Sequence, residues 1–143
     1  MTNTSLAQAY LQKATVRLQI LAVLLRESAF SDVVREAQEI VELASKGILR
    51  QVGIEPPRWH DVSSIIAAHA DRLPTLSSDA IDRLAEVSGW LRKEREFSFY
   101  GEIDFIPTES YDRASAERAI DDARWVVALA TEIIPPPATS DGP

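Results

Sequence analysis

The densest group of basic residues in the chain is formed by Arg92, Lys93 and Arg95. Arginine and lysine side chains neutralise phosphates, so this group is the part of the sequence best suited to contact a phosphate backbone. Tyr100 follows shortly after Arg95, and its aromatic ring can stack on a nucleic-acid base. The alternative role for this pair is structural, with Arg95 bound to an acid on the helix surface and Tyr100 packed at the helix end.

A second candidate site is the turn that carries Arg58 and His60, directly before Asp61. A guanidinium and an imidazole beside the amide groups of a helix N-terminus can bind a small anion or a nucleotide phosphate. The alternative is that His60 hydrogen-bonds across to the preceding helix and fixes the connection between the two helices. Both interpretations stay open at the level of the sequence.

Glu42 and Lys46 stand four residues apart in a segment of helical pattern. Such a pair stabilises an exposed helix by only about 0.2–0.5 kcal/mol. Because the pair lies beside an apolar stripe, it indicates either a groove in which Lys46 contacts a ligand or an ordinary solvated helix face.

The composition excludes several kinds of site. Cysteine is absent, which excludes disulfides and cysteine-based zinc sites. The sequence has no glycine loop for phosphates, no cluster of metal ligands and no nucleophile elbow, so we expect no metal and no cofactor. The net charge of −7 counts against a broad RNA-binding surface but is compatible with a local basic cleft that dimerisation doubles.

The chain shows no targeting or membrane-spanning pattern. Its N-terminus lacks a basic stretch followed by an apolar run, and no apolar segment reaches the roughly 18 residues that a membrane span requires. We therefore expect a soluble, cytoplasmic protein with no membrane contact.

The first half of the chain has the pattern of two long helices and one short helix. The first is predicted over residues 5–28, and the second begins with Ser31 as N-cap and stops near Gly53. A short helix over residues 61–72 follows, with Asp61 as its cap. His69 is expected to be satisfied within this short helix.

The second half adds two more long helices. Ser77 or Ser78 opens a helix that reaches about Phe97, and residues 100–110 read as a loop. The last helix carries the clearest apolar seam in the chain, at spacings of four and three residues: Ala116, Ile120, Ala123, Val127, Ala130 and Ile134. The tryptophans Trp59, Trp90 and Trp125 are expected to anchor the core or an interface.

These elements predict an all-α fold, an antiparallel helical bundle of four long helices plus one short helix. At 143 residues the chain is long enough for one domain with its own core. We assign the bundle to residues 1–137 and expect a disordered tail over residues 138–143.

Three blocks of the sequence resemble one known family. Residues 37–49 read AQEIVELASKGIL, residues 53–62 read GIEPPRWHDV, and residues 91–101 read LRKEREFSFYG. Their order resembles the HEPN family (higher eukaryotes and prokaryotes nucleotide-binding), whose members carry a Q-x-x-x-E-x-x-x-K-like helix followed by a G-x-x-P-P-x-x-H-D segment. The final helix is similar too, so the resemblance covers about residues 5–134.

This resemblance implies a helical bundle that forms a homodimer. It also implies a role in RNA-directed defence, in toxin–antitoxin modules where a HEPN ribonuclease often accompanies a minimal nucleotidyltransferase. Active members carry arginine and histidine separated by four to six residues. Neither His60 nor His69 has an arginine at that distance before it, and the nearest counterpart is Arg95, four residues, then Tyr100.

Two hypotheses about function follow. The first is a non-catalytic or degenerate dimeric module that binds RNA or a nucleotide and works with a nucleotidyltransferase-like partner. The alternative is a metal-independent ribonuclease toxin with Arg95 and Tyr100 as its candidate catalytic residues. The missing motif and the acidic charge favour the first, whose candidate ligand-binding residues are Arg58, His60, Arg92, Arg95, Tyr100 and Lys46.

Overall fold

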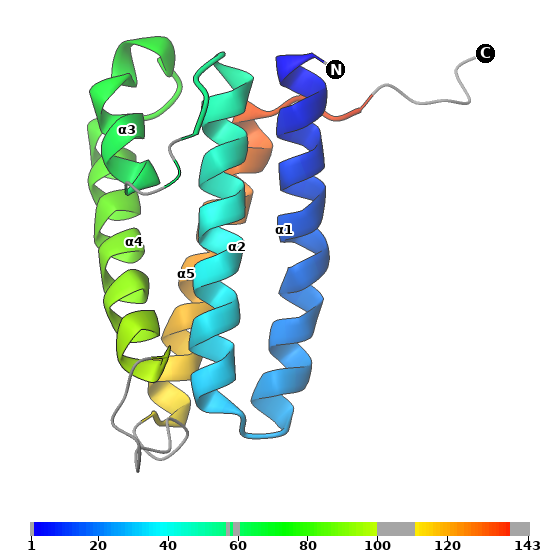
Figure 1. Ribbon diagram of the computed structural model, residues 1–143, viewed down its shortest axis with the longest axis vertical. Coiled ribbons are helices and arrows are strands. Elements are labelled where there is room, and N and C mark those ends of the chain that lie inside the picture. The colour runs from blue at the N-terminus through cyan, green and yellow to red at the C-terminus, as the bar shows by residue number, and fades with distance from the viewer. Residues whose placement is uncertain (1, 57, 59–60, 100–110, 138–143) are drawn as a thin grey trace, which may run out of the picture.

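The computed structural model describes residues 2–56, 58, 61–99 and 111–137, and for residues 94–99 it describes the backbone alone. Every regular element in this part of the chain is helical, and it contains no strand. In order, the elements are α1 (Asn3–Arg26), α2 (Phe30–Gln51), α3 (Val62–Ala68), the short 3-10 turn η1 (Ala70–Arg72), α4 (Ser78–Phe99) and α5 (Arg113–Ile133). The predicted all-α fold is confirmed (Figure 1).

The central helix of the bundle is α2, which packs against each of the other α-helices. The four long helices run alternately up and down, and α1 and α4 stand on opposite sides of α2 (Figure 1). The α3 helix lies between α2 and α4 along the chain and packs against both. This packing brings the segment that follows α2 against the side of α4.

The core is built from the apolar seams that face α2. All six seam residues predicted for the last helix are buried in α5 and at its C-terminal end. From α2, Ile40, Ile48 and Leu49 are fully buried, and Leu84 and Leu91 of α4 meet the same core. Burial of side chains of this size is the main favourable contribution to folding.

The boundary between α1 and α2 differs from the prediction. Ser31 was expected to cap the second helix, but it lies inside α2 and is buried, and Ala29 occupies the N-cap with no side-chain hydrogen bond. The reason is the turn before it: Ser28 adopts a positive φ of 58°, which reverses the chain early. The Ala29 N–H then donates to the Leu24 carbonyl at 2.9 Å, so α2 begins at Phe30.

Three other predicted helix ends are confirmed. Asp61 caps α3, accepting a hydrogen bond from the Ser63 N–H, and the Ser77 hydroxyl accepts one from the Ala80 N–H at the start of α4. Gly53 follows the end of α2 with φ of 80°, a conformation that glycine adopts without steric cost.

The short helix is less regular than expected. The segment predicted as one helix over 61–72 is α-helical only to Ala68 and continues as η1. His69 stands at the junction, with Nδ1 3.0 Å from the Ile65 carbonyl, so the histidine is satisfied within its own segment as expected.

Among the described residues, no helix combines the length and the apolar character needed to cross a membrane. The loop predicted over residues 100–110 and the tail predicted over 138–143 lie outside the described residues.

Candidate functional site

Asp61 joins the start of α3 to the side of α4. Its Oδ1 accepts hydrogen bonds from the Ser63 N–H at 3.0 Å and the Ser63 hydroxyl at 2.8 Å, both within α3. The same oxygen accepts the Ser88 hydroxyl of α4 at 3.3 Å and lies 3.6 Å from Nη1 of Arg92. One carboxylate therefore caps a helix, binds a second helix and holds an arginine. We refer to Asp61, Ser63, Ser88 and Arg92 as the Asp61 cluster.

The Asp61 cluster connects two of the candidate loci from the sequence. Arg92 comes from the basic group of α4, and its partner Asp61 directly follows the turn that carries Arg58 and His60. Arg58 is exposed and lies three residues before Asp61, which a chain spans within about 10 Å. Arg58 and Arg92 are thus brought to the same side of the bundle.

The Arg92 guanidinium pairs with Asp61 and is still partly accessible to solvent. Its side chain is 43% exposed, and the Asp61 side chain is 32% exposed. A guanidinium has five N–H donors, and the contact with Asp61 occupies only part of this donor set. Arg92 can therefore keep its contact with Asp61 and still donate to an anion from solvent.

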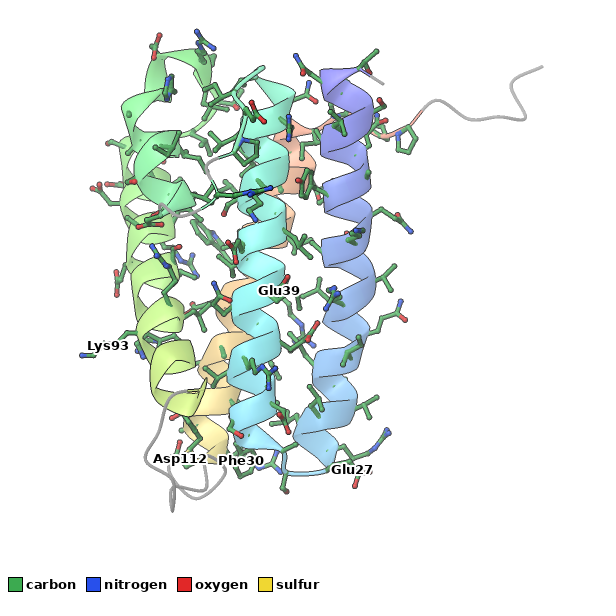
Figure 2. All side chains as sticks on the ribbon, in the orientation of Figure 1. Glu27, Phe30, Glu39, Lys93 and Asp112 are labelled. Carbon is green, nitrogen blue, oxygen red and sulfur yellow. The ribbon has the colours of Figure 1, made fainter. Side chains whose placement is uncertain are left out.

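The neighbouring basic residues of α4 are placed differently. Lys93 is exposed and extends away from the bundle (Figure 2). The α4 backbone continues to Phe99, which places Arg95 one turn beyond Arg92, but the Arg95 side chain lies outside the described part of the structure. His60 and Tyr100 also lie outside it.

A row of polar side chains runs along α2 at intervals of four residues. The Gln38 amide Nε2 donates to Glu42 Oε2 at 3.4 Å, and Glu42 Oε1 lies 3.5 Å from Lys46 Nζ. Gln38 is buried, and the Glu42 and Lys46 side chains are 31% and 26% exposed. The ion pair expected from the sequence is present, but it is half-buried instead of lying on a fully solvated face.

Ser45, next to this row, is also unusual. It is 2% exposed, and its hydroxyl has no hydrogen-bond partner among the described residues. The described residues show no contact between Lys46, which pairs within α2, and Arg92, which pairs with α3. Lys46 and Arg92 therefore each have their own carboxylate partner, and the role of Lys46 in ligand binding stays a prediction.

The sequence did not predict the cation–π contacts that Trp90 and Trp125 form with arginines. The Arg83 guanidinium of α4 lies 4.1 Å from the ring centre of Trp125 in α5, and the Arg118 guanidinium of α5 lies 4.0 Å from that of Trp90 in α4. Both tryptophans are half-buried. Each helix therefore supplies the arginine to one cation–π contact and the tryptophan to the other. Contacts of this kind between α4 and α5 contribute about 0.5–2 kcal/mol each.

The carboxylate of Asp122 is influenced by the charges of both arginines in these cation–π contacts. Its Oδ2 is 3.6 Å from Arg118 Nε, and its side chain is 14% exposed. Burial raises the pKa of the Asp122 carboxyl above its usual range, and the positive charges of Arg118 and Arg83 offset only part of this effect. The charged carboxylate is therefore less stable in the folded chain than in the unfolded one.

This raised pKa predicts a pH-dependent effect of Asp122→Asn. Since the native carboxylate is penalised above its folded pKa, the neutral variant should be the more stable protein at neutral pH. The difference should shrink as pH falls through the raised pKa, because the native side chain then becomes neutral too. Urea unfolding at neutral pH and at about pH 3 measures both free energies; a variant that is less stable at neutral pH would contradict the prediction.

A groove lies between the end of α1 and the start of α5. This groove of ≈ 270 Å³ is lined by Ala22, Leu25, Arg26, Arg113, Glu117, Ile120, Asp121 and Arg124. Its three arginines face two acids, and Arg113 pairs with Glu117 at 3.9 Å. The groove has one more arginine than acids, so it is an alternative phosphate-binding surface, and charge alone does not separate it from the Asp61 cluster.

Among the described residues, no group of three histidine, aspartate or glutamate side chains is placed to hold a metal ion. The Asp61 cluster consists of one arginine, two serine hydroxyls and the carboxylate that organises them. Such groups bind phosphates and position them.

Comparison with protein families gives one match. The family model described as HEPN domain matches residues 7–134, nearly the whole chain. No curated protein and no solved structure gives a significant match. The matched range contains all the described helices except the first residues of α1, so it includes the Asp61 cluster and the polar row of α2.

Proposed function

Because the chain belongs to the HEPN family, we propose that it is a dimeric, non-catalytic module that binds RNA or a nucleotide through phosphate. In this proposal it belongs to a toxin–antitoxin or defence system and works with a nucleotidyltransferase-like partner. The ligand-binding surface is formed by Arg92 and the turn with Arg58 and His60, and Arg95 and Tyr100 extend it along the chain.

The observation that carries this proposal is the contact between Asp61 and Arg92, 3.6 Å apart. An arginine held by a carboxylate loses little side-chain freedom when it binds a phosphate, so less of the binding energy is lost to ordering. The same contact brings α4 against the segment that supplies Arg58. Two cations from different parts of the chain can then reach one anion.

Two features favour binding over catalysis. The family's ribonuclease motif needs a histidine separated from the arginine by four to six residues, and in this chain four residues separate Arg95 from a tyrosine, Tyr100. A tyrosine hydroxyl with an ordinary pKa of about 10 is a poor base for the 2′-hydroxyl proton at neutral pH. The net charge of −7 further limits the protein to a small local contact with nucleic acid.

Arg92→Ala should weaken RNA binding about tenfold and reduce the salt dependence by roughly one phosphate contact. Fluorescence anisotropy with a short labelled single-stranded RNA, measured at several salt concentrations, gives both quantities. Arg124→Ala is the comparison variant, because it removes the same charge from an exposed position of α5 in the groove between α1 and α5. Equal or greater weakening by Arg124→Ala would contradict a site at Arg92.

The ribonuclease alternative has its own test. The purified protein is incubated with labelled RNA in the absence of metal, beside the Arg95→Ala and Tyr100→Phe variants. Our proposal predicts intact RNA in all three reactions at micromolar protein. Cleavage by the native chain that Arg95→Ala abolishes would establish the enzyme instead.

The proposal of a nucleotidyltransferase-like partner is tested by expressing the chain with and without the product of the neighbouring gene. Expression of the chain alone in bacteria should be tolerated if the chain has no nuclease activity. A nucleotidyltransferase-like product of the neighbouring gene should co-purify with the chain when the two are expressed together. Failure to co-purify would remove the partner from the proposal and leave the RNA-binding test unaffected.

A further inference from the structure

The groove between the end of α1 and the start of α5 combines an apolar floor with a charged rim. Leu25 of α1 is half-buried and Ile120 of α5 is 5% exposed, so these two larger apolar residues form the floor. The rim is formed by charged side chains of both helices: Arg26, Arg113, Glu117, Asp121 and Arg124. We call this surface, with its volume of ≈ 270 Å³, the α1–α5 groove.

The charged residues that α5 contributes to the α1–α5 groove follow a definite order. Arg113, Glu117, Asp121 and Arg124 lie at intervals of four, four and three residues, which places them along one side of the helix. The two arginines stand at the ends of this row, about 16 Å apart along the helix axis. The two acids lie between them.

The opposite directions of α1 and α5 bring a third arginine to one end of the row. Arg26 is the last residue of α1 and Arg113 is the first residue of α5. Their chain neighbours Glu27 and Asp112 both lie at the lower end of the bundle (Figure 2). One end of the α1–α5 groove therefore carries two guanidiniums from different helices, and the other end carries Arg124.

The three guanidiniums keep hydrogen-bond donors for a ligand. Arg113 lies 3.9 Å from Glu117 and Arg26 lies 4.0 Å from Glu27, and both distances are too long for a hydrogen bond. The side chains of Arg113 and Arg26 are 53% and 71% exposed. Arg124 forms no ion pair with any residue that the structure describes. External carboxylates can therefore bind at both ends of the groove.

We infer that the α1–α5 groove is a docking site for a short acidic peptide of a partner protein, bound in an extended conformation. The peptide carries an acidic residue at each end of a five-residue stretch and apolar residues between them. The first and fifth residues of an extended chain lie about 13 Å apart, and their side chains cover the remaining distance to Arg124 and Arg113. The apolar residues of the peptide then cover Leu25 and Ile120.

The acids in the middle of the row favour a peptide over a nucleic acid. A nucleic-acid backbone carries a negative charge at every nucleotide, so a bound strand would bring a phosphate beside Glu117 or Asp121. The peptide has its charges at the two ends and presents backbone N–H groups in the middle, from which these carboxylates accept hydrogen bonds. The apolar floor adds to this preference, because Leu25 and Ile120 offer no hydrogen bond to a phosphate.

The first test compares three peptides by fluorescence anisotropy with the complete chain. The probe is a fluorescein-labelled pentapeptide of sequence DLVLD with an amidated C-terminus, and it should bind saturably. The peptide NLVLN lacks the charges and DSSSD lacks the apolar middle, so each should bind at least about fivefold more weakly. Equal binding of the three peptides, or no saturable binding of DLVLD up to millimolar concentration, would overturn the docking site.

The second test places the peptide on the protein. Arg124→Ala should weaken DLVLD binding about three- to fivefold, since it removes one exposed ion pair. Arg72→Ala is the matched control, because it removes the same charge from an exposed position outside the groove and should leave binding unchanged. Ala22→Glu places a negative charge in the groove and should remove detectable binding. Its melting curve by circular dichroism should stay unchanged, because Ala22 is exposed. Equal effects of the two arginine variants, or full binding by a folded Ala22→Glu chain, would contradict this location.

A competition experiment separates this docking site from the proposed RNA contact, on which it does not depend. A short single-stranded RNA should leave bound DLVLD in place, because Arg92 and the Asp61 cluster lie outside the α1–α5 groove. Displacement of the peptide by RNA, together with weaker RNA binding by Arg124→Ala, would assign the groove to RNA and overturn the peptide. Weaker RNA binding by Arg92→Ala with unchanged peptide binding would support two separate surfaces.

Discussion

Replacing Asp61 with alanine should lower the free energy of unfolding by about 2–4 kcal/mol. The change removes the N-cap of α3 and, at the same time, the acceptor that the hydroxyls of Ser63 and Ser88 share among the described residues. Ser63 is 2% exposed and Ser88 is 8% exposed, so water cannot readily replace the lost acceptor. Urea or thermal unfolding followed by circular dichroism measures the loss.

Two matched variants separate the parts of this effect. Asp61→Asn keeps a capping oxygen and should recover most of the stability, while it removes the charge that holds Arg92. Asp112→Ala removes a comparable cap at the start of α5, where, among the described residues, Asp112 Oδ1 bonds to its own helix through Ser115. An Asp61→Ala loss no larger than that of Asp112→Ala would show that the contact between α3 and α4 contributes nothing to stability.

Gly47→Val should lower the free energy of unfolding by about 1–3 kcal/mol. A Cβ at this position would meet Ile134 Cδ1 at 3.1 Å and the Ala7 carbonyl oxygen at 3.3 Å. The carbonyl belongs to the backbone of α1 and cannot turn aside as a side chain can, so α1 must move away from α2. The absence of a side chain at Gly47 is what allows α1 and α2 to pack closely along their upper ends (Figure 1).

Gly89→Val is the control for this prediction. Gly89 also lies within a long helix, but a Cβ there meets no atom within 4 Å. The same substitution should therefore change stability by no more than about 0.5 kcal/mol. Equal losses at the two positions would show that the effect does not come from the contact of position 47 with α1 and would contradict close packing at Gly47.

The sequence was sufficient for the fold because its apolar spacing is regular. In α5 the residues from Ala116 to Ile134 repeat at helical intervals, and each is buried as predicted. The helix ends were predictable where a side chain or a glycine determines them, as at Asp61 and Gly53. The start of α2 was not, because it depends on the backbone conformation of Ser28, which no side-chain pattern indicates.

The candidate site was only partly predictable. The sequence identified Arg92 as basic and Asp61 as a cap, but their contact joins residues far apart in the chain and depends on how α3 packs against α4. The stacks of Arg83 on Trp125 and Arg118 on Trp90 were missed for the same reason. The roles of His60, Arg95 and Tyr100 stay predictions, since their side chains lie outside the described residues.

The spacing of residues along a helix predicts which side chains pair but does not predict how deeply the pair is buried, as the ion pair of α2 shows. An interval of four residues correctly predicted that Glu42 and Lys46 pair, but it could not give their burial. Burial depends on the neighbouring helices, which leave each side chain about a quarter to a third exposed. Partial removal from water strengthens the attraction between the two charges, so Lys46 is held more firmly than an ordinary surface lysine.

The most direct test of the central claim is a map of the RNA contact on the folded protein. Isotopically labelled chain is titrated with a short single-stranded RNA, and the amide chemical shifts are followed by nuclear magnetic resonance. The account predicts that the largest changes occur at Arg58, Asp61, Ser63, Ser88 and Arg92. Saturation of the protein with changes confined to the groove of Arg26, Arg113 and Arg124, or with no change around Asp61, would contradict it.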